Sequence, residues 1–130
     1  FDTSSLPDDA IIKSATLRGY LVANYDETPF DVVIVRGAGL NPPCNMSNYG
    51  LLLPRTESLG SINSQDLVVG PGNDITLNGL GLAEISLTGE TVLALRSSRD
   101  ISSTAPSQKE FANFGSRERS VPFRLIITYF

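Results

Sequence analysis

The sequence predicts an all-β fold, an antiparallel β-sandwich of jelly-roll type with one short helical turn. Residues 13–22 alternate between apolar and polar side chains, and several later runs are short and rich in Val, Ile and Leu. Clusters of Gly, Pro, Asn and Asp separate these runs, a pattern typical of a sandwich or jelly roll. With 130 residues, of which 41% are hydrophobic, the chain fits one folded domain over residues 1–130.

The N-terminal third shows the clearest strand signals. Residues 1–3 look like the tail of a strand, and a turn at 7–9 leads to the strand predicted at 13–22. The odd positions of this strand form its apolar face: Ala15, Leu17, Gly19 and Leu21. After a turn at 26–29, the continuous Val-Ile run of residues 30–36 indicates a strand that is buried on both faces. Residues 37–48 form a long polar loop.

The later elements follow from the same signals. Short strands are predicted at 49–53, 66–69 and 74–77, and stronger ones at 91–97 and 121–130. Pro122 lies near the start of the last strand, where a missing N–H donor is tolerated. Residues 78–89 depart from the period of two. Because Asn78 can cap a first turn and Gly89 can close a last one, the helical turn is predicted here.

Composition excludes several classes of function. A net charge of −4 argues against nucleic-acid binding, and no apolar run approaches the roughly 20 residues of a membrane helix. The chain has no histidine, which is the commonest general base and metal ligand. Its single cysteine, Cys44, allows no internal disulfide. We interpret Cys44 as a small half-buried hydrophobe, with pairing to another chain or to a segment absent from this sequence as the alternatives.

Four stretches carry a resemblance to a known family: FDTSSLPDDAIIKSATLRGYL (1–21), TPFDVVIVRGAGL (28–40), LNGLGLAEISLTGETVLALRSSRD (77–100) and FGSRERSVPFRLIITYF (114–130). The chain resembles the DNRLRE-type extracellular β-sandwich domains, which are related to carbohydrate-binding modules of polysaccharide lyases. The resemblance implies a non-catalytic module that is extracellular or at the cell surface and binds carbohydrate. Its motifs are mainly apolar and structural, so it supports the fold more strongly than the function.

Domains of this family usually begin with strands ahead of the Phe-Asp pair, which here stands at Phe1 and Asp2. Two interpretations stay open. One is a trimmed chain, and the other is a sheet edge that a neighbouring chain completes by strand addition. The second interpretation predicts a structural subunit of a surface filament or another extracellular assembly, or a homo-oligomer formed through an open sheet edge.

Carbohydrate sites use exposed aromatic rings that stack on the apolar faces of sugars. The aromatic candidates are Tyr20, Tyr25 and Tyr49. Arg96 and Arg99 are candidates for binding the carboxylates of an acidic polysaccharide. The alternative is an ordinary half-buried sheet position for each tyrosine, and for the arginines an ion pair with a nearby acid.

Other sites have weaker sequence support. Asp26, Glu27 and Asp31 are weak candidates for a calcium site, the one cofactor that the sequence leaves open. Asn45, in Asn-Met-Ser, fits the acceptor pattern for N-glycosylation. The chain has neither a Gly-x-Ser-x-Gly motif nor a phosphate-binding loop, so we expect no enzymatic activity. The sequence therefore predicts a surface-binding or adhesion module whose partner is a polysaccharide, with the strand-completed structural subunit as the alternative.

Overall fold

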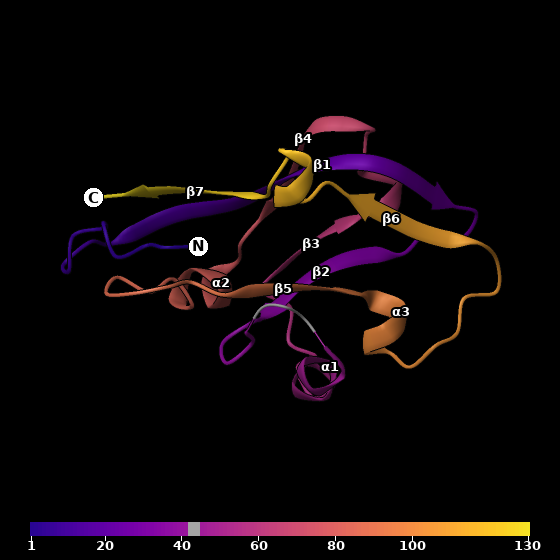
Figure 1. Ribbon diagram of the computed structural model, residues 1–130, viewed down its shortest axis with the longest axis horizontal. Coiled ribbons are helices and arrows are strands. Elements are labelled where there is room, and N and C mark those ends of the chain that lie inside the picture. The colour runs from indigo at the N-terminus through magenta and orange to yellow at the C-terminus, as the bar shows by residue number, and fades with distance from the viewer. Residues whose placement is uncertain (42–44) are drawn as a thin grey trace.

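The computed structural model describes residues 1–41 and 45–130, so Cys44 lies outside the described residues. Two antiparallel sheets face each other, and a few short helices cover their ends and one face (Figure 1). The elements are β1 (Ile12–Asp26), β2 (Asp31–Arg36), α1 (Met46–Leu52), β3 (Gly60–Asn63), η1 (Ser64–Asp66), β4 (Gly70–Thr76), α2 (Gly79–Ala83), β5 (Leu93–Ser97), α3 (Ser98–Ile101), β6 (Glu110–Phe114), η2 (Arg117–Arg119) and β7 (Arg124–Tyr129).

The first sheet is built on β1, which contains the predicted strand at 13–22 and extends four residues beyond it. β4 pairs with one edge of β1. β7 and β6 lie end to end along the other edge, β7 beside residues 12–18 and β6 beside residues 21–26. Register shifts between Gly19 and Ala23 mark a bulge in the long strand, and a bulge bends a strand and increases its local twist.

The second sheet has β2 in the centre, between β3 and β5. All four residues from Val32 to Val35 are buried, so the prediction of a strand covered on both faces is confirmed. One face of β2 packs against the first sheet. The other is covered by α1 and the residues after it, which Figure 1 shows on the side away from the first sheet.

The core lies between the two sheets. Its buried members come from β1, β2, β4 and the connections around them: Ala15, Leu17, Leu21, Phe30, Val32, Ile34, Leu59, Leu67, Ile75, Leu77 and Ile85. Gly19 supplies space in this layer, because a Cβ there would lie 2.5 Å from the Phe123 ring and 3.0 Å from the Phe114 ring. Those two rings pack against each other with centroids 5.2 Å apart. Because glycine has no side chain, the rings of Phe114 and Phe123 can pack directly over the backbone of β1 at residue 19.

The strand predicted at 49–53 is wrong, because these residues belong to helix α1 and its C-terminal end. Asn45 caps this helix, and its side-chain oxygen accepts hydrogen bonds from the N–H groups of Ser47 and Asn48. Within the run that suggested a strand, Tyr49, Leu51 and Leu53 are exposed on the helix and Leu52 is half-buried.

The strand predicted at 66–69 is also wrong. Residues 64–66 form η1, and the following backbone bonds to a side chain instead of a sheet. The Asn73 side chain accepts from the Val68 N–H at 2.8 Å and donates to the Val68 carbonyl at 2.9 Å. These two hydrogen bonds to a side chain satisfy the backbone groups of Val68 in place of the hydrogen bonds of a β-sheet.

The predicted helical turn is confirmed as α2, and Asn78 caps it through a hydrogen bond from the Gly81 N–H. The helix ends at Ala83, well before Gly89, so the predicted C-terminal boundary is wrong. Two strands, β3 and β6, were not predicted. Both are short, and neither carries a continuous run of β-branched residues.

The N-terminal segment runs antiparallel to the residues that lead into β5. Asp2 faces Glu90 in an isolated bridge. Phe1 and Thr91 exchange two backbone hydrogen bonds, of 2.9 and 2.8 Å. The Thr3 hydroxyl is buried beside that of Thr91, 2.8 Å away. Residues 1–3 therefore extend the second sheet along the edge of β5 that does not face β2.

Candidate functional site

A groove of about 700 Å³ lies beside the C-terminal part of β5, at residues 95–97, where the two sheets part. Its inner wall is apolar and comes from both sheets: Phe30, Val32, Leu95, Ala112 and Phe114. Its outer wall lies on the α1 side of the second sheet and comprises Tyr49, Leu53, Arg96 and Asp100. The groove thus borders β5 on both faces.

The edge of β5 that borders this groove is unpaired. The Gly37 N–H donates to the Val92 carbonyl at 3.0 Å, which extends the ladder between β2 and β5. In an antiparallel ladder the direction of the backbone groups alternates, so Leu93 and Leu95 direct their N–H and C=O groups away from β2. Within residues 1–41 and 45–130, no hydrogen-bond partner meets these groups.

Arg96 lies at the groove and is bound to other parts of the chain through its Nε and Nη1 groups. Its side chain is only 3% exposed and pairs with Asp100, with 2.7 Å between Nε and Oδ2. Its Nη1 donates to the carbonyls of Leu52, Leu53 and Arg55 at 2.8–3.2 Å. Arg96 therefore holds the covering segment on the outer face of the second sheet, through hydrogen bonds from its Nε and Nη1 groups.

The Asp100 carboxylate accepts hydrogen bonds from two side chains. Besides Arg96, the Tyr49 hydroxyl donates to its Oδ1 at 3.1 Å. The hydrogen bond from Arg96 is the main cause that lowers the pKa of Asp100 below its ordinary value. Asp100 is therefore ionised over the whole neutral range and acts as a structural acceptor, not as a proton donor.

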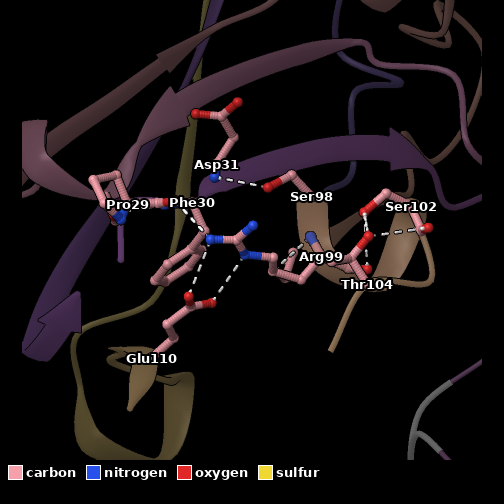
Figure 2. A network of polar contacts seen from close by, with 10 residues as sticks. Pro29, Phe30, Asp31, Ser98, Arg99, Ser102, Thr104 and Glu110 are labelled. Atoms are coloured by element: carbon pink, nitrogen blue, oxygen red, sulfur yellow. Dashed lines mark hydrogen bonds and ion pairs between the residues drawn. The ribbon is translucent and has the colours of Figure 1, made fainter. Parts of the chain in front are cut away.

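Arg99 closes one end of the groove. Figure 2 shows its guanidinium between Glu110 and the Pro29 carbonyl, with bonds of 3.2–3.3 Å. The neighbouring Ser98 hydroxyl accepts from the Asp31 N–H at 2.9 Å. Both predicted arginines are thus in ion pairs within the chain, and Arg99 ties α3 to the start of β6 across the two sheets.

The three tyrosines do not share one surface. Tyr49 is 53% exposed at the outer wall of the groove. Tyr25 stacks on Phe111 with centroids 6.0 Å apart, under the Lys109 ammonium at 4.6 Å. Tyr20 lines a separate small hollow of about 180 Å³. Only Tyr49 comes together with the two predicted arginines.

The Tyr25 surface has features that sequence reasoning missed. Phe111 is the cross-strand neighbour of Tyr25. It did not stand out because it lies in β6, which was not predicted, and Lys109 directly precedes that strand. A hydrogen bond to Glu27 is the main cause that raises the pKa of Tyr25. This ring is held at both ends, by stacking and by its hydroxyl, as a local structural cluster.

The acidic candidates for calcium do not come together. No group of three or more Asp, Glu, His or Cys side chains suited to a metal occurs within the described residues. Asp31 instead accepts a 2.9 Å hydrogen bond from the Asn63 side chain. The oxygen of Asn45 is used in capping α1, in a segment where Met46 is 92% exposed. Across the described ranges, no helix has the length and apolar character needed to cross a membrane.

Comparisons of the chain with family models, with curated proteins and with solved structures find no match in any of the three. Fold and site therefore define the class by themselves. The chain is an all-β domain of two facing antiparallel sheets, with an apolar groove along an unpaired strand edge.

Proposed function

We propose that this protein is a non-catalytic β-sandwich assembly module, extracellular or at the cell surface, whose groove receives an extended strand from a neighbouring chain. The observation that carries the proposal is the groove beside the unpaired edge of β5, which leaves room on both faces of the sheet. A strand added at an edge needs this geometry, because its side chains point alternately to the two faces.

The chemistry of the groove fits a strand better than a small polar ligand. Leu93 and Leu95 offer unpaired backbone groups, and these are satisfied best by another backbone. The inner wall is apolar, and the two arginines of the outer wall and groove end already have carboxylate partners. Apolar side chains on alternate positions of an added strand would fill the inner wall without competing with these ion pairs.

The test uses a synthetic peptide of about nine residues, long enough at roughly 3.3 Å per residue to span β5. It carries valines at alternate positions, threonines between them and a lysine at each end. On adding it, we expect slower hydrogen exchange at the Leu93 and Leu95 amides, and no change at the Ala94 amide, which already faces β2. Unchanged exchange at both leucines, together with a chain that stays monomeric by mass, would overturn the proposal.

Proline substitutions provide the matched variants. Leu95→Pro removes the N–H that faces the groove and leaves the ladder to β2 intact, since edge strands tolerate proline with the missing donor outward. We expect it to abolish peptide binding while circular dichroism stays native. Leu93→Pro repeats the test at the second outward position. Ala94→Pro removes a bond to β2 and should instead destabilise the fold.

Carbohydrate binding is the second candidate, and the exposed Tyr49 ring in the groove favours it, beside the Asp100 acceptor. The resemblance of the sequence to carbohydrate-binding sandwich domains supports the same idea. Affinity electrophoresis in neutral and acidic polysaccharides tests it: Tyr49→Ala should abolish retardation, while Tyr20→Ala and Tyr25→Ala should not. Retardation that depends on Tyr49, with no response to the peptide, would favour this candidate over strand addition.

The jelly-roll arrangement is also a proposal. What supports it is that strands distant in sequence lie side by side: β1 pairs with β4, β6 and β7, and β2 pairs with β5. A solved structure of the chain with a strand in the groove tests it through the order of the strands.

A further inference from the structure

We propose that the hollow beside Tyr20 binds a small oxyanion, such as sulfate or the carboxylate of an acidic sugar, with Arg124 as its main donor. The hollow belongs to the first sheet and shares no lining residue with the groove. This inference therefore goes beyond the proposed function and does not depend on it.

The hollow lies where β1 changes its pairing partner. β7 pairs with β1 as far as Arg18, and β6 pairs with it from Leu21 onwards. The connection between these two strands, which contains η2, leaves the sheet at this break (Figure 1). On the other side of β1, two residues of β4, Pro71 and Gly72, lie opposite the single residue Tyr20, which is the arrangement of a bulge. The break and the bulge together leave a concave surface of about 180 Å³.

A row of charged residues crosses the sheet at this hollow. Asp74 on β4 and Arg124 on β7 are the two direct neighbours of Arg18 on β1. Asp74 accepts from Nε and Nη2 of Arg18 at 2.6 and 2.7 Å, so the Nη1 group of Arg18 is left over. Arg124 has no hydrogen-bond or ion-pair partner within residues 1–41 and 45–130. Because like charges directly opposite each other are destabilising, an anion held by Arg124 and Arg18 would offset their repulsion.

Arg124 differs in this respect from the arginines of the groove. Arg96 and Arg99 have carboxylate partners within the chain. Acids are not scarce, since the chain has 14 acidic residues against 10 basic ones. None of the acids in the described part of the chain lines the hollow. Residues 117–124 carry three arginines and one glutamate, so this segment is positively charged in a chain whose net charge is negative.

The other polar residues of the hollow fit the same ligand. Tyr20 and Ser120 line it, and neither hydroxyl has a hydrogen-bond partner among the described residues. Guanidinium and hydroxyl groups donate hydrogen bonds, and each oxygen of a carboxylate or sulfate can accept more than one. The volume is well below the roughly 300–1,000 Å³ of pockets for drug-sized ligands. The hollow therefore has room for one small group, and its side chains offer donors to that group.

Titration with sodium sulfate tests the site, with sodium chloride adjusted so that the ionic strength stays constant. In ¹H–¹⁵N spectra we expect saturable shifts of the Gly72, Ser120 and Arg124 amides. The Leu93 and Leu95 amides beside the groove should not move. Shifts of the hollow that increase linearly with sulfate and never saturate would overturn the proposal.

Three variants separate a site from general attraction to positive charge. Arg124→Gln should weaken sulfate binding about tenfold, the loss expected when a charge-assisted hydrogen bond is removed. Arg124→Lys keeps the charge without the planar fork, so its affinity should lie between those of the parent and Arg124→Gln. Arg119→Gln makes the same change in net charge at an exposed residue that does not line the hollow, and should change the affinity less than about twofold because exposed charges are screened by salt. Equal losses in Arg124→Gln and Arg119→Gln would overturn the site.

Methyl glucuronide and methyl glucoside distinguish the source of the anion. If the hollow takes a carboxylate carried by a sugar, the glucuronide should bind more tightly than sulfate. If it takes a free ion, sulfate should bind more tightly. In both cases the uncharged glucoside should leave the Ser120 and Arg124 amides unshifted, and a glucoside that binds as well as the glucuronide would overturn the proposal. The peptide test of the groove is unaffected by any of these results, so the two proposals fail separately.

Discussion

The Arg99 guanidinium donates to both carboxylate oxygens of Glu110, through Nε to Oε2 at 3.3 Å and through Nη2 to Oε1 at 3.2 Å. Arg99 belongs to α3, which follows the second sheet, and Glu110 begins β6 in the first sheet. Their side chains are 28% and 5% exposed. This bidentate pair therefore links the two sheets at one end of the groove (Figure 2).

We expect Glu110→Gln to destabilise the fold by about 2 kcal/mol, because one charge-assisted bond is lost and a neutral amide faces a guanidinium. Urea unfolding measures the change. Glu118→Gln, at an exposed position in η2, is the control and should shift the free energy of unfolding by less than about 0.5 kcal/mol. Equal effects of the two substitutions would contradict a role for the Arg99 pair.

Arg96→Met should be more damaging, by about 3 kcal/mol, because it removes the buried partner of Asp100 and takes one hydrogen-bond donor from each of three carbonyls. Hydrogen exchange should also show loosening of residues 52–55, which Arg96 holds. Arg119→Met, at an exposed arginine, is the matched control. Native protection of residues 52–55 in Arg96→Met would show that the covering segment is held by other contacts.

Acid should weaken the fold through two carboxylates with lowered pKa values. The hydrogen bond from Arg96 lowers the pKa of Asp100, and the one from Arg18 lowers the pKa of Asp74. A group with a lowered folded pKa stabilises the fold above its unfolded pKa of about 3.9, and this contribution is lost as the pH falls through the folded pKa. Asp100→Asn should therefore unfold at lower urea than the parent at pH 7, and the gap should narrow towards pH 2.

Asp9→Asn, at an exposed turn, is the control for this acid series. It should leave the urea midpoint unchanged at both pH values. A gap between Asp100→Asn and the parent that persists unchanged at pH 2 would mean that the carboxylate charge is not the source of the effect.

Gly37→Ala should destabilise the fold at the end of the β2–β5 ladder, where Gly37 pairs with Val92. A Cβ at Gly37 would lie 2.6 Å from the Val92 carbonyl group and 2.7 Å from the Leu93 N, so the backbone of one strand must shift. We expect a cost of about 2 kcal/mol, as for overpacking in a core. Gly50→Ala, in α1 with open space around it, should be neutral or stabilise by about 0.5 kcal/mol. Thermal unfolding of the two variants compares them.

Local pattern was enough to predict the long strands. The alternation of residues 13–22 and the Val-Ile run of 30–36 predicted β1 and β2, since burial on one or two faces leaves a direct trace in residue order. Asn78 identified the start of α2 because its capping bond is made within three residues. These features depend on neighbours in the sequence.

Contacts between distant residues decided what the pattern could not. Residues 49–53 are helical because Asn45 caps them and Arg96, 41–44 residues away, binds the carbonyls at 52, 53 and 55. The strand candidate at 66–69 failed because the Asn73 side chain took its backbone groups. β6 forms through pairing with β1, because Glu, Ala and Asn, which are depleted in strands, alternate with its two phenylalanines and blur the local signal.

The candidate site also combines features that are local in the sequence with features that depend on long-range contacts. The sequence by itself determined the class of the chain, an all-β domain, together with the apolar faces of its main strands and the residue types present at the groove. Only the tertiary structure decided that Tyr49, Arg96 and Arg99 meet while Tyr20 and Tyr25 lie elsewhere, and that the arginines are already paired. The physical reason is that an unpaired strand edge is a property of sheet order. Sheet order is set by contacts between residues far apart in the chain, whereas strand propensity and alternation are local.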